Sequence, residues 1–298
     1  MADKPKIGFI GIGNMGWPMA ANLVTAGFTL AVADYRRIQA ENFAQQVGGT
    51  APDTLGELAA ASDVIITMLP TSAAVGTVLK DVLPAMRPGT IVVDMTSGVP
   101  TETVSLAALV TEAGGAMIDA PVSGGVPRAR TGQLAIMVGG EDAVVAKVEG
   151  VLKVMGPSIL RTGGVGSAHA MKALNNLVSA GGFLVGIEAL LIGQRFGLDP
   201  ALMVDVLNVS TGMNNSTQKK FRQFVLSRSF DSGFGLDLML KDVSIALGIA
   251  RDTATPAPFS SLCRELSAAA QAMLGRGADH TELAKISERL VGDELTLK

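Results

Sequence analysis

The stretch that decides the fold of this chain is Lys6-Ile-Gly-Phe-Ile-Gly11-Ile-Gly13-Asn14-Met15-Gly16. An apolar run leads directly into the pattern G-x-G-x-x-G, and a helical pattern follows to about Ala26. This order predicts a strand, a tight turn and a helix, whose first backbone N–H groups would face a pyrophosphate. We therefore predict a dinucleotide site at Gly11, Ile12, Gly13, Asn14 and Met15; the alternative is a strand-to-helix turn that binds nothing.

An acidic residue supports the dinucleotide interpretation. The apolar run from Thr29 to Ala33 ends in Asp34, which lies 23 positions after Gly11. A carboxylate at about this spacing can accept hydrogen bonds from an adenosine ribose, and it repels a 2′-phosphate. We predict NAD as the cofactor, while Arg36 and Arg37 leave NADP possible because a guanidinium pairs well with phosphate.

Composition excludes several classes of protein. The chain has 298 residues, of which 48% are hydrophobic and 17% charged, enough for two domains with large cores. A net charge of −3 without a basic run argues against nucleic acid. The single cysteine, Cys263, excludes an intrachain disulfide and leaves little for a metal site. We expect a cytoplasmic protein without a signal peptide, and we expect no membrane span because the apolar region Leu177–Ile187 is short and flanked by polar residues.

Residues 1–163 alternate apolar runs with amphipathic patterns, which is typical of a doubly wound, mostly parallel sheet of the Rossmann type. Ligands of such sheets bind at the carboxyl ends of the strands. The predicted strands are Ile7–Ile10, Thr29–Ala33, Val64–Met68, Thr90–Val93, Ala116–Ile118 and Leu134–Val138. The predicted helices between them include Arg37–Gln46, Leu55–Ala60 and Thr101–Glu112.

Residues 164–298 contain no convincing strand and form the predicted second, all-α domain. A helical pattern runs from about Ser167 to Phe196, where Gly197 and Pro200 end it. This long connecting helix is apolar on much of its circumference, so we expect a partner subunit to cover it in a homodimer or homotetramer. Further helices are predicted at Pro200–Ser210, Gln218–Ser227, Leu236–Ala254, Phe259–Arg276 and from Thr281.

Two segments carry candidate chemistry for a substrate. Ser123-Gly124-Gly125 follows a predicted strand, and its hydroxyl and unshielded N–H groups suit a small carboxylate, unless it is an ordinary glycine turn. Lys172 and Asn176 share one face near the start of the long helix. A lysine among apolar residues can exchange a proton with a substrate oxygen; the alternative is a solvated helix lysine, and His169 is a rival acid–base group.

Three further segments are candidates for cofactor contacts. Lys241 interrupts an apolar helical stretch, as a charge facing a ligand would, although it can equally reach solvent. Two loops follow the third and fourth predicted strands, where a dinucleotide crosses the sheet. They contain Met68, Leu69 and Pro70 in one and Thr96 in the other, although Thr96 also suits a helix cap.

Taken in order, GFIGIGNMGWPMAANL, MLP, DMTSGVP, DAPVSGG, GVGSAHAMKALNN and LKDV resemble the β-hydroxyacid dehydrogenase family over essentially the whole chain. This family includes 3-hydroxyisobutyrate dehydrogenase and tartronate semialdehyde reductase. The resemblance implies that Lys172 is the catalytic lysine, that Asn176 holds substrate and lysine, and that Ser123, Gly124 and Gly125 bind the substrate carboxylate. It also implies that Gly11, Gly13, Asn14 and Met15 bind the dinucleotide backbone, with Leu69, Pro70, Thr96 and Lys241 along it. The fourth motif departs slightly, with Thr96-Ser97 where Ser-Thr is usual.

The resemblance implies hydride transfer between a nicotinamide cofactor and a small β-hydroxy acid or its semialdehyde, with Lys172 exchanging the hydroxyl proton. A tartronate semialdehyde reductase and an imine reductase remain alternatives within the same chemistry. A non-catalytic dinucleotide-binding module is the alternative from another class, and an intact Lys172 and Asn176 argue against it. The sequence does not identify the particular acid.

Overall fold

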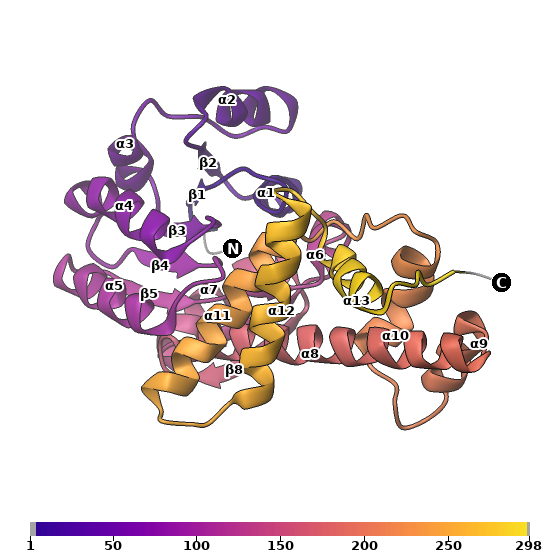
Figure 1. Cartoon of the computed structure of the whole chain (residues 1–298). Helices are drawn as coiled ribbons and strands as arrows, with labels where there is room; N and C mark the ends of the chain where they lie inside the picture. The colour runs from indigo at the N-terminus through magenta and orange to yellow at the C-terminus, as the bar shows by residue number, and fades with distance from the viewer. Residues whose placement is uncertain (1–3, 297–298) are drawn as a thin grey trace. The chain divides into compact units, whose positions relative to one another are not determined.

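The computed structural model describes residues 4–296 (Figure 1). The chain folds as two compact units, which meet in sequence between Lys172 and Ala173. That boundary lies inside a long helix, whereas the strand-and-helix alternation of the sequence stops at Gly163.

The first unit is built on an eight-stranded sheet in the order β2-β1-β3-β4-β5-β7-β6, with β8 paired to β7. Strands β1 to β5 are parallel, and β7 runs antiparallel to β5. The order of the strands reverses at β1, between β2 and β3, and such a switch point opens a ligand crevice at the carboxyl edge. The strands are β1 (Ile7–Ile10), β2 (Leu30–Ala33), β3 (Val64–Thr67), β4 (Ile91–Asp94), β5 (Ala116–Asp119), β6 (Val122–Ser123), β7 (Ala135–Gly139) and β8 (Ser158–Gly163).

Two hydrophobic cores cover the two faces of this sheet. Alternate residues of one strand enter different cores: Phe9 packs with α1 and α7, whereas Ile10 packs with α3, α4 and α5. Strands β1 to β5 and β7 therefore consist mostly of buried apolar residues, as expected for a sheet covered on both faces. The helices are α1 (Gly16–Thr25), α2 (Arg37–Gln46), α3 (Leu55–Ala60), α4 (Ser72–Val82), α5 (Pro100–Glu112), α6 (Gly125–Arg130) and α7 (Asp142–Met155), with a 3₁₀ turn η1 (Leu83–Ala85).

All six predicted strands are present, within one or two residues of their predicted bounds. The sequence analysis did not find β6 and β8. Strand β6 has two residues, and β8 has no buried residue, so neither leaves an apolar run in the sequence.

The second unit is helical. Its elements are the continuation of α8 (Ser167–Phe196), then α9 (Pro200–Asn208), α10 (Asn215–Lys219), a π-helix η2 (Phe221–Leu226), α11 (Leu236–Asp252), α12 (Pro258–Leu274), a 3₁₀ turn η3 (His280–Leu283) and α13 (Ala284–Val291). The bounds of α8 are those predicted. The prediction of one α-helix at Gln218–Ser227 is wrong. A short α-helix capped by Asn214 ends at Lys220, where φ is −130°, and a π-helix follows it.

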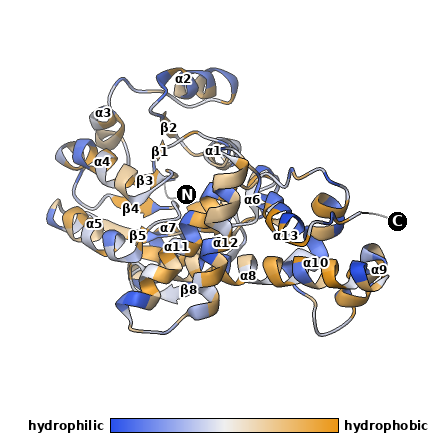
Figure 2. Cartoon of the chain, in the orientation of Figure 1, coloured by the Kyte–Doolittle hydropathy of each residue, from blue (hydrophilic) through white to orange (hydrophobic). Residues whose placement is uncertain are grey.

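Helix α8 is 30 residues long, with a mean hydropathy of 1.6 in its most apolar 18-residue window. Its length and composition would allow it to cross a membrane, and 56% of that window is buried within the chain, as in the core helix of a soluble protein. Hydrophobic residues follow one another along much of its length (Figure 2). The expected absence of a membrane span stays a prediction.

Candidate functional site

The glycine loop after β1 is shaped for a close approach of strand and helix. Gly11 adopts φ +102°, and a Cβ there would lie 2.3 Å from the carbonyl oxygen of Met68. A Cβ on Gly16, at the start of α1, would lie 1.8 Å from the carbonyl oxygen of Gly11. By contrast, a Cβ on Gly13 would meet no protein atom within 4 Å. The fold itself therefore requires Gly11 and Gly16, whereas open space lies beside Gly13, where the sequence analysis expects a pyrophosphate.

Asp34 lies at the end of β2 and faces the glycine loop. Its Oδ2 accepts a hydrogen bond from the N–H of Ile12 at 2.9 Å, and its Oδ1 accepts one from the N–H of Arg36 at 3.0 Å. The Asp34 side chain is 6% exposed, so it supports the loop from within. A carboxylate has about four acceptor positions, which leaves capacity for ribose hydroxyls.

The loops after β3 and β4 are fastened to one another. Thr96 Oγ1 accepts a hydrogen bond from the N–H of Leu69 at 3.1 Å. Asp94, which is fully buried, accepts hydrogen bonds through Oδ1 from Thr67 Oγ1 at 2.9 Å and from the N–H of Thr96 at 3.0 Å. Met68 and Leu69 thus lie with Thr96 at the carboxyl edge of the sheet, beside the glycine loop.

The predicted carboxylate-binding turn follows β5 along the chain. Ser123 is the last residue of β6 and pairs with Ala135 of β7. Gly124 and Gly125 adopt φ +133° and φ +66° as α6 begins, a conformation that favours glycine. A side chain at Gly124 would also collide with that of Arg128, at 2.6 Å. Hydroxyl and amide groups therefore stay unshielded here, as binding of a small carboxylate requires.

A carboxylate from β5 holds the beginning of α8. Asp119 is fully buried, and it accepts hydrogen bonds from the N–H of Gly166 at 2.7 Å and from the N–H of His169 at 2.8 Å. These are donors of the first turn, which have no partner within the helix. Burial raises the pKa of Asp119, while the charge of His169 and the two N–H groups oppose that rise. Asp119 therefore fixes the turn that leads to Lys172, which is itself 9% exposed.

His169 is a packing residue in this structure. Thr103 Oγ1 donates to the carbonyl of Val99 at 3.0 Å and lies 2.7 Å from His169 Nδ1, so Nδ1 is the donor of that second hydrogen bond. His169 Nε2 lies 4.0 Å from Asp94 Oδ2, and both atoms are buried without a hydrogen-bond partner. The ring is fully enclosed, which argues against a role as the acid–base group for a substrate.

The second unit contains a polar network centred on Asp242. Asn176 is 6% exposed and donates through Nδ2 to Asp242 Oδ2, while Lys241 Nζ lies 3.0 Å from Asp242 Oδ1. Asp242, itself 2% exposed, thus joins two residues that the sequence analysis assigned to different ligands. Asn176 follows Lys172 by four residues in one continuous helix, so both lie on one face of α8.

The structure therefore gathers the predicted residues into two groups. The first unit holds the glycine loop, Asp34, Met68, Leu69, Pro70, Thr96 and the Ser123–Gly125 turn at the edge of the sheet, and Lys172 at its end in α8; the helical unit holds Asn176 and Lys241. The sequence analysis missed the three aspartates that position them, Asp94, Asp119 and Asp242. Asp94 and Asp119 end strands, and Asp242 directly follows Lys241. These positions are the features of the sequence that could have identified them. Within residues 4–296 no group of three His, Cys, Asp or Glu side chains could hold a metal.

Comparison with known proteins agrees with this arrangement. Residues 6–164 match the NAD-binding domain of 6-phosphogluconate dehydrogenase, and residues 166–287 match the NAD-binding domain of NADP-dependent 3-hydroxyisobutyrate dehydrogenase. The chain is 37% identical to 2-(hydroxymethyl)glutarate dehydrogenase of Eubacterium barkeri, over 98% of both chains. It is 34% identical to 2-hydroxy-3-oxopropionate reductase of Escherichia coli (strain K12), over 97% of this chain and 99% of that one.

The structure is similar to that of Mycobacterium tuberculosis 3-hydroxyisobutyrate dehydrogenase with L-serine. The TM-score is 0.88 at 32% identity, covering 97% of this chain and 99% of the other. The likeness thus extends through both the sheet unit and the helical unit.

Proposed function

This chain belongs to the β-hydroxyacid dehydrogenase family, and on that premise we propose which of its residues carry the family's reaction. The protein is an NAD(P)-dependent oxidoreductase that transfers a hydride between the nicotinamide cofactor and a small β-hydroxy acid or the matching semialdehyde. The bound nicotinamide supplies the hydride chemistry. The remaining steps, which position the substrate and move a proton, belong to the residues of this chain.

Lys172 is the proposed general acid–base group. The observation that carries this assignment is its place: a buried lysine in the second turn of a helix whose first turn is fixed by Asp119. A side chain held in this way keeps a constant position relative to a bound substrate, which proton transfer requires. In the oxidative direction Lys172 takes the proton of the substrate hydroxyl, and in reduction it returns a proton to the carbonyl oxygen.

Ser123, Gly124 and Gly125 are the proposed partners of the substrate carboxylate, through one hydroxyl and the backbone N–H groups. Asn176 is the proposed partner of the substrate on the helical unit. Its Nδ2 is committed to Asp242, so the side chain has a defined direction. Together these groups would fix the reacting carbon between the carboxylate anchor and the amine of Lys172.

The cofactor contacts follow the order of the loops. Gly11, Ile12, Gly13, Asn14 and Met15 would hold the pyrophosphate, while Asp34 would accept hydrogen bonds from the adenosine ribose and so favour NAD over NADP. Met68, Leu69, Pro70 and Thr96 would line the cofactor along the sheet edge, and Lys241 would reach it from the helical unit. The support is the open space at Gly13 and the reserve acceptor capacity of Asp34.

We also propose a homodimer or homotetramer in the cytoplasm. Along α8 a row of apolar side chains is exposed at Met171, Leu174, Val178, Val185 and Ile192, with spacings of three, four and seven residues. Such spacings place them on one stripe of the helix, and a stripe of this kind favours a partner helix.

Turnover of an acid panel tests the proposed function. 3-Hydroxyisobutyrate, glycerate, serine and 2-hydroxy-3-oxopropionate would be assayed with NAD(H) and with NADP(H) at fixed salt. A small β-hydroxy acid or its semialdehyde should give the highest kcat/KM, and 2-hydroxy-3-oxopropionate is the second candidate because of the 34% identical reductase. Turnover of a cyclic imine without turnover of any acid would instead favour an imine reductase.

A further inference from the structure

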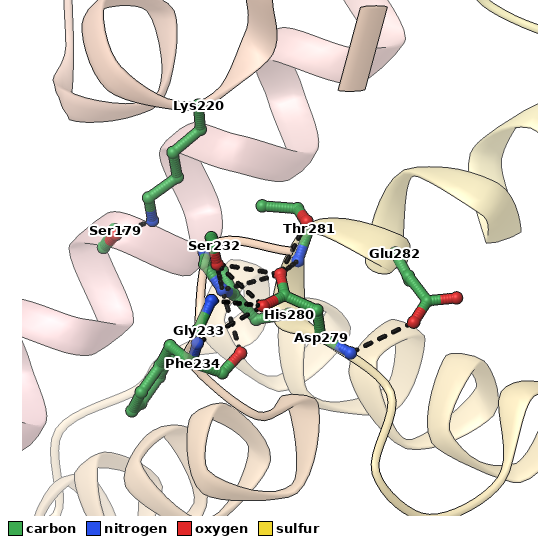
Figure 3. Close-up of polar contacts among 9 residues, drawn as sticks. All are labelled: Ser179, Lys220, Ser232, Gly233, Phe234, Asp279, His280, Thr281 and Glu282. Carbon is green, nitrogen blue, oxygen red and sulfur yellow. Dashed lines mark hydrogen bonds and ion pairs between the residues drawn. The ribbon is translucent and has the colours of Figure 1, made fainter. Parts of the chain in front are cut away.

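Lys220 is a partly buried cation at a break in the helical unit. It lies between α10 and the π-helix η2, and its Nζ donates to Ser179 Oγ of α8 at 3.2 Å (Figure 3). Single turns of π-helix frequently accompany functional sites, because they re-aim a side chain at the cost of regular hydrogen bonding. Burial lowers the pKa of Lys220 to about 8, so the side chain is mainly an ammonium at neutral pH.

The carboxylate of Asp279 opposes the fall in the pKa of Lys220 through its charge but forms no ion pair with it. Asp279 accepts hydrogen bonds from Ser232 Oγ, from Thr281 and from the N–H of Gly233, which commits both of its oxygens (Figure 3). Within residues 4–296, Lys220 forms no ion pair at or below 4.0 Å. An ammonium has three N–H donors, so Lys220 keeps donors beyond the one that Ser179 accepts.

His280, the buried neighbour of Asp279, supplies no charge that could compensate Lys220 at neutral pH. Its Nδ1 lies 3.2 Å from the carbonyl of Phe234, while its Nε2 is buried without a hydrogen-bond partner. Burial and then the charge of Lys220 lower the pKa of His280 to about 4. A partly buried cation without an ion-pair partner is costly to a fold, and an anionic ligand would reduce that cost.

The contact with Ser179 places this cation next to α8 and indicates which anion it would meet. Lys172, Asn176 and Ser179 are spaced by four and three residues, so their side chains lie on one face of the helix. Ser179 is seven residues beyond Lys172, about 10 Å along the axis. Within the helical unit, Ser179 and the Lys220 ammonium that it contacts therefore lie about one helical turn beyond Asn176 on the same face of α8.

We propose that Lys220 and Ser179 form a subsite for a second, distal carboxylate, which makes β-hydroxy dicarboxylic acids the preferred substrates of this enzyme. The inference rests on the proposed roles of Lys172 and Asn176. It assigns to the chain a specificity determinant in the helical unit, separate from the Ser123–Gly125 turn that would hold the first carboxylate.

The test compares two substrates that differ in one charge: 2-(hydroxymethyl)pentanedioate and its 5-amide. We expect the wild type to favour the diacid by at least about tenfold in kcat/KM, the size of a hydrogen bond to a charged group. In Lys220→Met and Ser179→Ala the preference should fall, mainly through a higher KM for the diacid, with kcat/KM for the amide changed less than about twofold. Lys219→Met, at the exposed neighbouring position, is the matched control and should keep the wild-type preference.

Two measurements keep the outcome decisive. Lys220→Met should raise the melting temperature of the ligand-free protein, because it removes a partly buried charge that has no ion-pair partner; a lower melting temperature together with equal losses for both substrates would make Lys220 structural and overturn the proposal. If the wild type turns over an acid of the panel above but not 2-(hydroxymethyl)pentanedioate, the preference for dicarboxylic acids is overturned; if it turns over no acid at all, the proposed function fails. Binding of pentanedioate, measured as a shift in melting temperature, then decides the subsite: a shift lost in Lys220→Met supports it, and no shift in the wild type overturns it.

Discussion

The Oδ2 atom of Asp34 accepts a hydrogen bond from the backbone N–H of Ile12 at 2.9 Å. The residue expected to select the cofactor therefore also supports the loop expected to hold the pyrophosphate. The two functions of this carboxylate can be separated by an amide. The amide keeps an oxygen that accepts from Ile12 but loses the negative charge on which selection of the cofactor depends.

For Asp34 we predict NAD over NADP in the wild type and a smaller preference in Asp34→Asn. The asparagine oxygen can still accept from Ile12, while the repulsion of a 2′-phosphate is gone. The ratio of kcat/KM for NAD to that for NADP should fall by about tenfold or more, equivalent to ~1.4 kcal/mol. Asp34→Ala, which also removes the acceptor, should weaken both cofactors. A wild type that prefers NADP would refute this interpretation of Asp34.

Substitution of Lys172 tests the acid–base assignment. Lys172→Ala should lose at least about two orders of magnitude in kcat while the Kd of the cofactor, measured by fluorescence titration, stays within a few-fold. The exposed helix lysine Lys147 supplies the control, since Lys147→Ala should leave both quantities unchanged. Near-normal turnover of Lys172→Ala across the pH range would exclude Lys172 as the proton-transfer group.

Ser123→Ala should mainly raise the KM of carboxylate substrates, by about tenfold, because one hydrogen bond to a charged group is lost. The backbone N–H groups of Gly124 and Gly125 remain, so kcat should fall less. Initial rates over a range of substrate and cofactor concentrations separate the two constants. An unchanged substrate KM with a collapse of cofactor binding would place this turn in the cofactor site.

Asp119→Asn should loosen the start of α8. The amide offers one acceptor oxygen where the carboxylate serves both Gly166 and His169, so one N–H of the first turn is left unpaired at a cost of about 1–2 kcal/mol. We expect a lower melting temperature and a lower kcat, with cofactor affinity retained. Asp142→Asn, at the exposed first turn of α7, is the control. Full activity in Asp119→Asn would show that the placement of Lys172 does not depend on this cap.

The lowered pKa of His280 leads us to expect that the stability of the fold depends on pH. The pKa of His280 is about 4 in the folded chain against 6.5 in the unfolded chain, so between these values the unfolded chain binds more protons. The free energy of unfolding should therefore fall as the pH falls from 6.5 to 4, by about 1–3 kcal/mol. Urea denaturation at several pH values measures this slope. It should be smaller in His280→Asn, and the same slope in both proteins would assign the effect to other groups.

The sequence by itself determined the local structure and the order of the motifs. The strand, turn and helix around Gly11 follow from an apolar run and glycine spacing, and the 30 residues of α8 follow from an uninterrupted helical pattern that ends at Gly197. These features depend on residues within a few positions of one another, which is the range that periodicity and capping describe. For the same reason β8 was missed, since its residues are exposed or half-buried and carry no apolar pattern.

Only the tertiary structure decided which polar groups meet. Asp119 reaches Gly166 across 47 residues, Asp242 reaches Asn176 across 66, and Lys220 reaches Ser179 across 41. No local propensity encodes such pairs, because they arise when strands and helices pack and bury the groups together. Burial then decides their energetics: an aspartate without a partner would be too costly inside the fold, and a partly buried lysine without an ion pair, such as Lys220, marks a place where a ligand can supply a negative charge.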